Sequence, residues 1–199
     1  MTATPAAPAA AAAAPATTTA CTSHHGVCVF FTGLSGAGKS TIATALAGAI
    51  ESTFACPVTL LDGDVVRTNL SRELGFSRQD RDTNIERIAF VAAEVVKHGG
   101  IVISAAIAPY EAARLNARQK VEQAGRFVLV YLSTSLAVCE GRDTKGLYAK
   151  ARRGEISMFT GVSDAYELPT RPDLTIDTDK TTVDEAVVSI ISAIGKGHA

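Results

Sequence analysis

Apolar residues gather in short continuous runs that alternate with longer segments of helical spacing. The runs cover residues 27–32, 57–61, 101–106, 127–132 and 173–177. Short runs that are apolar at every position are typical of strands buried on both faces. The helical segments cover residues 40–53, 80–98, 110–124, 135–141 and 182–195. This alternation predicts an α/β domain with a mostly parallel central sheet, helices on both faces, and ligands at the carboxyl ends of the strands.

Two segments do not fit the alternation. Residues 1–25 are almost entirely Ala, Pro and Thr, which bury too little to offset the entropy of ordering, so we expect a disordered tail or linker followed by one domain over 26–199. Residues 142–171 are rich in charge, Gly and Thr. A stretch of this length without a sheet strand predicts a mobile lid, with a solvated surface loop as the alternative.

The charge and hydropathy of the chain narrow the classes of partner. The formal net charge is −1, which favours neither nucleic acid nor an anionic membrane as a partner. No apolar run approaches the roughly 18 residues that cross a bilayer. Cys28 and Cys139 lie in apolar surroundings and are expected in the core. We therefore expect a cytoplasmic protein that binds neither nucleic acid nor membrane.

Between the first strand and the first helix lies a Gly, four further residues and then Gly-Lys-Ser, which matches the phosphate-binding loop. The residues predicted to bind the nucleotide here are Gly33, Leu34, Ser35, Gly36, Ala37, Gly38, Lys39, Ser40 and Thr41. The glycines let backbone amides wrap a polyphosphate, and the helix N-terminus adds positive dipole character. Lys39 is expected along the β- and γ-phosphates, and the Ser40 hydroxyl on Mg²⁺. A plain connection is the alternative, but spacing and flanks together predict nucleoside triphosphate binding.

Two carboxylates, Asp62 and Asp64, follow the second predicted strand on the ligand edge of the sheet. Asp62 can hold Mg²⁺ through water or accept the proton of an attacking hydroxyl, and Asp64 can take the other task, which makes both candidates for catalysis. The alternative is a helix cap, because Asp64 precedes the helical residues Val65 and Val66. We expect at most one of the two to serve only as a cap.

Arginines and loop aromatics follow the two carboxylates. Arg67 and Arg81 suit an oxyanion because a guanidinium donates several hydrogen bonds at once. Phe76 and Phe159 lie in loop settings, where each can stack on a base or join a satellite core. The residues alone therefore predict a small-molecule kinase with an anionic acceptor.

Taken together, these motifs resemble the adenylylsulfate (APS) kinase family, over about residue 26 to the C-terminus. The matching segments, in the order that the family has them, are Gly33–Thr41, Leu61–Arg67, Leu74–Ser77, Asp80–Ile85, Pro109–Tyr110, Lys145–Tyr148 and Phe159–Val162. Many kinases share the phosphate loop. The Asp-Gly-Asp block combined with Lys-Gly-Leu-Tyr and Phe-Thr-Gly is far more specific.

The resemblance implies a three-layer P-loop kinase fold, with ATP and Mg²⁺ as cofactors and APS as the substrate. The reaction would transfer the γ-phosphoryl group to the 3′-hydroxyl of APS and give 3′-phospho-APS (PAPS) and ADP in sulfate assimilation. It also implies a homodimer, and fusion to or association with ATP sulfurylase.

The resemblance assigns site residues as well. Phe76 and Phe159 would sandwich the APS adenine, and Asp62 would lie at the magnesium and the acceptor hydroxyl with Asp64 close by. Arg142 would pack on the ATP adenine, and the contact of Lys145 would form only when the lid closes. The other residues expected around APS are Arg67, Arg81, Asn84, Ile107, Leu147, Thr160 and Gly161.

The sequence departs from the family pattern at a few positions. Many members carry a Ser before the Pro-Tyr pair, described in some as a phosphoserine intermediate, and this chain has Ala108. Direct transfer between bound ATP and APS does not need that Ser. Thr83 and Glu86 stand where the family tends to carry Glu and Arg. Two alternative functions stay open: a gluconate- or shikimate-type kinase, and a catalytically silent nucleotide-binding domain of a sulfate-activation fusion protein.

Overall fold

The computed structural model describes residues 26–195, and the predicted tail at 1–25 lies outside the described residues. The described strands are β1 (Val27–Thr32), β2 (Val58–Asp62), β3 (Ile101–Ala105), β4 (Arg126–Leu132) and β5 (Leu174–Ile176). They form one sheet in the order β2-β3-β1-β4-β5, and every pairing is parallel. All five predicted strands are therefore confirmed, with ends that shift by at most one residue.

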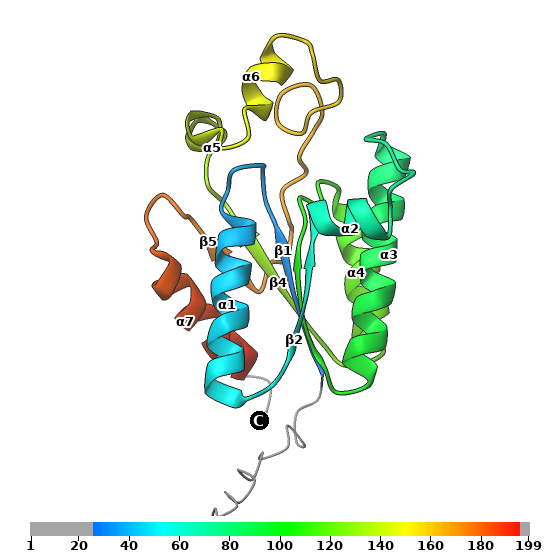
Figure 1. Cartoon of the computed structure of the whole chain (residues 1–199), viewed down its shortest axis with the longest axis vertical. Helices are drawn as coiled ribbons and strands as arrows, with labels where there is room; N and C mark the ends of the chain where they lie inside the picture. Colours follow the sequence, from blue (N-terminus) through cyan, green and yellow to red (C-terminus); the bar gives the residue numbers. More distant parts are fainter. Residues whose placement is uncertain (1–25, 196–199) are drawn as a thin grey trace, which may run out of the picture.

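The described helices lie on both faces of the sheet and beyond its carboxyl ends. They are α1 (Lys39–Phe54), α2 (Gly63–Asn69), α3 (Arg78–Lys97), α4 (Glu111–Glu122), α5 (Leu136–Arg142), α6 (Leu147–Arg152) and α7 (Val183–Gly195). Helices α1 and α7 cover one face, and α3 and α4 cover the other (Figure 1). Helices α5 and α6 stand beyond the carboxyl ends of the strands (Figure 1). This arrangement confirms the predicted three-layer α/β fold.

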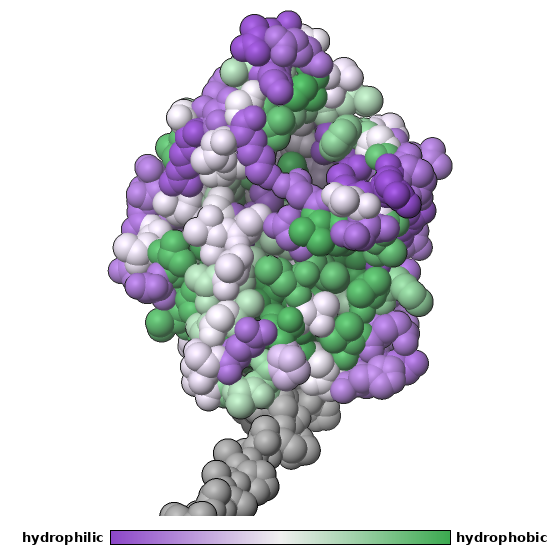
Figure 2. All heavy atoms as spheres, viewed as in Figure 1, coloured by the Kyte–Doolittle hydropathy of each residue, from purple (hydrophilic) through white to green (hydrophobic). Residues whose placement is uncertain are grey.

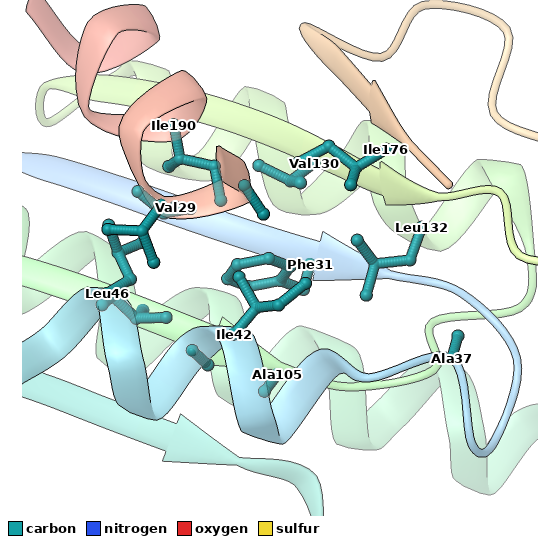
Figure 3. Packing of buried hydrophobic residues seen from close by; sticks show 14 of the residues in the cluster. Val29, Phe31, Ala37, Ile42, Leu46, Ala105, Val130, Leu132, Ile176 and Ile190 are labelled. Atoms are coloured by element: carbon teal, nitrogen blue, oxygen red, sulfur yellow. The ribbon is translucent and has the colours of Figure 1, made fainter. Parts of the chain in front are cut away.

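Two apolar cores hold the helices against the sheet. On the α1 and α7 face, Phe31 of β1 packs with Ile42 and Leu46 of α1 and Ile190 of α7 (Figure 3). These side chains are at most 2 % exposed, and burying one of this size stabilises the fold by about 1.5–3 kcal/mol. On the opposite face, the apolar stripe of α3 packs on Cys28, which is fully buried as expected. Cys139 is also buried as a free thiol.

Strand β2 differs from the expectation that every strand is buried on both faces. Its residues are only half-buried, and Leu60 is 37 % exposed. The reason is its place at the edge of the sheet, where it pairs with β3 alone. An apolar run therefore predicts a strand correctly but does not decide whether the strand lies at the centre or at the edge. Within residues 26–195, no helix is both long and apolar enough to cross a membrane.

Candidate functional site

The loop between β1 and α1 contains backbone positions that only glycine occupies without strain. Gly36 and Gly38 have φ angles of 76° and 93°, in the left-handed region that L side chains rarely adopt. A Cβ atom on Gly36 would also lie 3.0 Å from the carbonyl oxygen of Cys139. The loop leads into the N-terminus of α1, where the first backbone amides have no helical partner. This combination forms an anion site.

Lys39 lies inside this loop and is only 8 % exposed. Its ammonium donates hydrogen bonds to the carbonyl oxygens of Gly33 (2.9 Å) and Leu34 (2.7 Å). Burial lowers the pKa of Lys39 from 10.5 to about 8, because the charged form loses its solvent. A polyanion that enters the loop would therefore stabilise the charged form of Lys39.

Asp62 ends β2 and faces the start of α1. Its Oδ2 accepts a hydrogen bond from the Ser40 hydroxyl (2.6 Å), and its Oδ1 accepts one from the Asp64 amide (2.9 Å). Asp62 is therefore the N-cap of α2, whereas the sequence pointed to Asp64 as the cap; Asp64 instead lies in the first turn and forms an ion pair with Lys145. The Ser40 hydroxyl and the Asp62 carboxylate are adjacent oxygen ligands of the kind that Mg²⁺ prefers.

Helices α2 and α3 place two arginines, Arg67 and Arg81, in the same cleft as Ser40 and Asp62. The Arg67 guanidinium lies 4.5 Å from the centre of the Phe76 ring. Burial and the nearby Arg81 lower the pKa of Arg67, because both disfavour its positive charge. Asn84 is buried, and its Oδ1 has no hydrogen-bond partner among the described residues. An unsatisfied buried oxygen at such a site favours a ligand that donates to it.

Arg81 differs from Arg67 because protein oxygens already occupy most of its donors. It donates to the carbonyl oxygens of Phe76 (2.9 Å) and Met158 (2.5 Å) and to the Thr160 hydroxyl (2.9 Å). These bonds tie α3 to the far end of the 142–171 segment. Of the five N–H donors of a guanidinium, two are left for a ligand.

The two expected aromatics are placed differently. Phe76 is 54 % exposed at the mouth of the cleft, and Phe159 is 9 % exposed. The Phe159 ring meets Tyr148 edge to face, with ring centres 5.0 Å apart. One aromatic is thus free to stack on a ligand, while the other forms part of the wall.

All these groups open into one cleft of about 1130 Å³ at the carboxyl ends of the strands. Figure 2 shows a recess in the upper part of the surface, below the segment that carries α5 and α6. The predicted site residues that line the cleft are Ser35, Gly36, Gly38, Lys39, Ser40, Thr41, Asp62, Asp64, Arg67, Phe76, Arg81, Asn84, Ile107, Arg142, Lys145, Leu147, Phe159 and Thr160. Four predicted residues, Gly33, Leu34, Ala37 and Gly161, do not line it. Pockets that hold one small-molecule ligand measure about 300–1,000 Å³, and this cleft is larger than that range.

The family model described as adenylylsulphate kinase matches residues 25–177 of this chain. The chain belongs to the adenylylsulphate kinase family. A protein named adenylyl-sulfate kinase from Picosynechococcus is 47 % identical to it over 171 residues, which cover 86 % of this chain and 94 % of that protein.

The comparisons also include longer relatives and solved structures of the adenylylsulphate kinase family. A Coccidioides immitis protein named sulfate adenylyltransferase is 53 % identical over 169 residues, but this chain spans only 30 % of its length. The Mycobacterium tuberculosis APS kinase CysC, solved in complex with AMPPNP and APS, is similar with a TM-score of 0.83 and 39 % identity. That match covers 86 % of this chain and 99 % of the solved one.

Sequence reasoning missed Thr178 in the site of this adenylylsulphate kinase family member. Its hydroxyl lies 3.1 Å from the carbonyl oxygen of Ala37, to which it donates, and accepts from the Arg142 guanidinium (2.8 Å). Arg142 also donates to the carbonyl oxygen of Gly36 (3.3 Å). Thr178 and Arg142 thus bind two backbone carbonyl oxygens of the phosphate loop. Thr178 comes two residues after β5, so the rule that ligands bind at carboxyl ends of strands could have indicated it.

The 142–171 segment of the adenylylsulphate kinase domain contains two parts with different attachments. In the first part, Asp143 caps α6, a short helix that the sequence pattern did not reveal, by accepting from the amides of Tyr148 and Ala149 (both 3.0 Å). In the second part, Asp164 accepts from the Tyr110 hydroxyl (2.6 Å), and the Glu167 carboxylate accepts from the Glu111 amide (2.7 Å). The second part is therefore fastened to α4.

Proposed function

We propose that this protein transfers the γ-phosphoryl group of ATP to the 3′-hydroxyl of APS, giving PAPS and ADP. The observation that carries the proposal is the single cleft that joins a phosphate loop to a paired-arginine site. Membership of the adenylylsulphate kinase family and the likeness to a kinase solved with AMPPNP and APS support this choice of substrates.

ATP would bind on the α1 side of the cleft. Backbone amides of the loop and the Lys39 ammonium would take the phosphates, which are better partners for a buried cation than its present carbonyls. Arg142 lines the same side and would pack against the adenine. Ser40 and Asp62 would hold Mg²⁺, which when bound supplies positive charge between the β- and γ-phosphates.

APS would bind on the α2 and α3 side. Arg67, the two remaining donors of Arg81, and Lys145 would take the phosphosulfate, whose charge offsets the repulsion between the guanidinium groups. Phe76 would stack on the adenine from the exposed side, and Phe159 would close the pocket from the wall.

Asp62 lies between the two halves and would orient the acceptor hydroxyl toward the γ-phosphoryl group. Positioning and charge stabilisation dominate phosphoryl transfer, so one carboxylate at this place is sufficient. Ala108 has no hydroxyl, so the transfer runs directly between the substrates without a phosphoserine at that position. We confine the proposed lid to residues 143–157, since the residues after them are bonded to α3 and α4.

We further propose a homodimer in the cytoplasm that acts alone or joined to a sulfate adenylyltransferase. The length of the Coccidioides relative supports the joined arrangement, and the near-complete match to the Picosynechococcus kinase supports independent action. Sedimentation of the purified protein, alone and with a sulfate adenylyltransferase, tests these assemblies.

A substrate panel with coupled ADP detection tests the reaction. APS, gluconate and shikimate are each offered with MgATP, and the nucleotide product with APS is identified by mass. We expect ADP release only with APS, and a product heavier than APS by one phosphoryl group. ADP release with gluconate or shikimate would favour that class of kinase, and nucleotide binding without any turnover would indicate a silent domain.

A further inference from the structure

The most deeply buried arginine of the described chain, Arg114 of α4, has no role in the site as proposed above. It is 1 % exposed, although an arginine is rarely placed out of solvent without a reason. Its guanidinium forms two hydrogen bonds to one oxygen of Glu111, at 2.6 and 2.9 Å. That pairing offsets the charge, and it leaves the outer donors free to act elsewhere.

Those donors bind two backbone carbonyl oxygens that belong to different segments, only one of which lines the cleft. Nη1 donates to the Ala108 oxygen and Nη2 to the Glu167 oxygen, both at 2.6 Å. Ala108 follows Ile107, which lines the acceptor side of the cleft. Glu167 belongs to residues 158–167, the segment after the proposed lid, which we call the stem and which carries Phe159 and Thr160. A single planar cation therefore connects the loop after β3 to the stem of the lid.

The backbone at Ala108 shows why such a clamp is needed. Ala108 has a φ angle of 45°, a left-handed conformation that costs a residue with a Cβ about 1–2 kcal/mol. Such a conformation persists only where the surroundings fix it. Here the carbonyl oxygen is held by Arg114, with a longer bond from the Thr32 hydroxyl (3.2 Å). Without the guanidinium, only the Thr32 hydroxyl would hold the Ala108 oxygen, so Ala108 and Pro109, which also line the cleft, would shift. The Ile107 oxygen would keep its own bonds from the Thr32 hydroxyl (2.7 Å) and the Gly33 amide (3.4 Å).

We propose that Arg114 is a positioning residue for the acceptor half of the cleft, acting through the strained loop 107–109 and the stem at Glu167. It is not among the residues that line the cleft. The role rests on the proposed function in one respect, that the acceptor held there is APS. The expected signature is a rise in the KM for the acceptor with little change in the KM for ATP, because the phosphate loop has its own supports.

The test compares Arg114→Lys with Arg118→Lys, a matched control one turn further along α4 whose guanidinium pairs with Asp173 and Glu122. Lysine keeps the charge but cannot reach two carbonyls at once. We expect the KM for APS to rise about tenfold in Arg114→Lys, with the KM for ATP within about twofold and Arg118→Lys unchanged. Glu111→Gln provides the same comparison, with a smaller expected rise, if Arg114→Lys does not fold.

Ala108→Gly supplies the rescue that a merely structural role would not give. Glycine adopts the left-handed conformation without strain, so the loop should keep its shape with a weaker clamp. We expect Ala108→Gly to restore most of the lost APS affinity in the Arg114→Lys background. Equal rises in both KM values, or no rescue by glycine, would overturn the proposal.

Amide hydrogen exchange separates this inference from the proposed function. Arg114→Lys should speed exchange in peptides covering residues 105–110, and Arg118→Lys should not, whatever the acceptor is. If the wild-type protein makes no PAPS, the choice of acceptor is wrong and the exchange result still decides the role of Arg114. If it makes PAPS and exchange is unchanged in Arg114→Lys, the inference alone is wrong.

Discussion

Replacing Lys39 with Met should remove most of the turnover and yet stabilise the free protein. The activity would fall because the charge beside the transferred phosphoryl group is lost, at a cost of about 10²–10³ in rate by analogy with other electrostatic donors. The stability would rise because the free protein buries a cation that has no carboxylate hydrogen-bonded to it. These opposite signs distinguish a residue kept for binding from one kept for folding.

The size of the gain follows from the pKa of Lys39. Its fall from 10.5 to about 8 on burial corresponds to about 3 kcal/mol against the charged form, at 1.36 kcal/mol per unit. The two carbonyl hydrogen bonds at 2.9 and 2.7 Å offset part of this, by about 1 kcal/mol each. We therefore expect Lys39→Met to raise the free energy of unfolding by about 1–3 kcal/mol at pH 7.

The gain should depend on pH in a defined direction. Between pH 8 and 10.5 the folded protein has lost the Lys39 proton while the unfolded chain keeps it. The unfolded state then binds more protons, so the stability of the wild type rises with pH across this window. The Met variant lacks that rise. Its advantage should be complete below pH 8 and absent near pH 10.5.

Urea unfolding in buffer without nucleotide or magnesium measures both quantities, at pH 7 and at several values up to 10.5. Lys97→Met is the matched control, because Lys97 has a side chain 62 % exposed and its removal should change stability by less than about 0.5 kcal/mol. A Lys39→Met variant that is less stable than the wild type at pH 7, or a difference that does not shrink with pH, would refute the reasoning.

Three further predictions concern the cleft. Chelation of Mg²⁺ should abolish turnover reversibly. Asp62→Asn should raise the Mg²⁺ concentration needed for half-maximal rate about tenfold or more, because one anionic ligand is lost. An unchanged Mg²⁺ requirement in a metal titration would show that Asp62 is not part of the metal site. Lys145→Met should leave the melting temperature within about 2 °C, because its ion pair with Asp64 is largely exposed, while raising the KM for APS; a large fall in melting temperature would instead make the pair structural. Phe76→Ala should raise the KM for APS about tenfold and that for ATP little, since one stacked base contributes about 1–3 kcal/mol; the opposite order in steady-state kinetics would place ATP there.

The fold was predictable because its signals are local. Continuous apolar runs located all five strands, and helical spacing located α1, α3, α4, α5 and α7. Helix α6 was missed, since its six residues begin after a glycine and are capped by Asp143 from a preceding turn. Helix α2 was seen only as a helical start after Asp64, and its true cap is Asp62. Short helices are held by contacts that a periodic pattern does not contain.

The part of the candidate site that lies in recognisable sequence motifs was predictable. The phosphate loop was named from its spacing, the two aspartates from their place after a strand, and the arginines of α2 and α3 from their residue type. The structure brings all of them to one cleft. Thr178 and Arg114 were not named. Each acts on a backbone carbonyl far away in the sequence, at Ala37 and Ala108, and a carbonyl leaves no mark in the residue type.

By itself, the sequence determined the five strands and five of the described helices along the chain, the phosphate loop and the resemblance to the adenylylsulfate kinase family. Each of these depends on residues within a few positions of one another. The tertiary structure alone decided which strand lies at the edge, which aspartate oxygens are engaged, how deeply Lys39 is buried, and which arginine holds the loop at Ala108. These properties depend on distances between segments remote in the chain, and only packing fixes such distances.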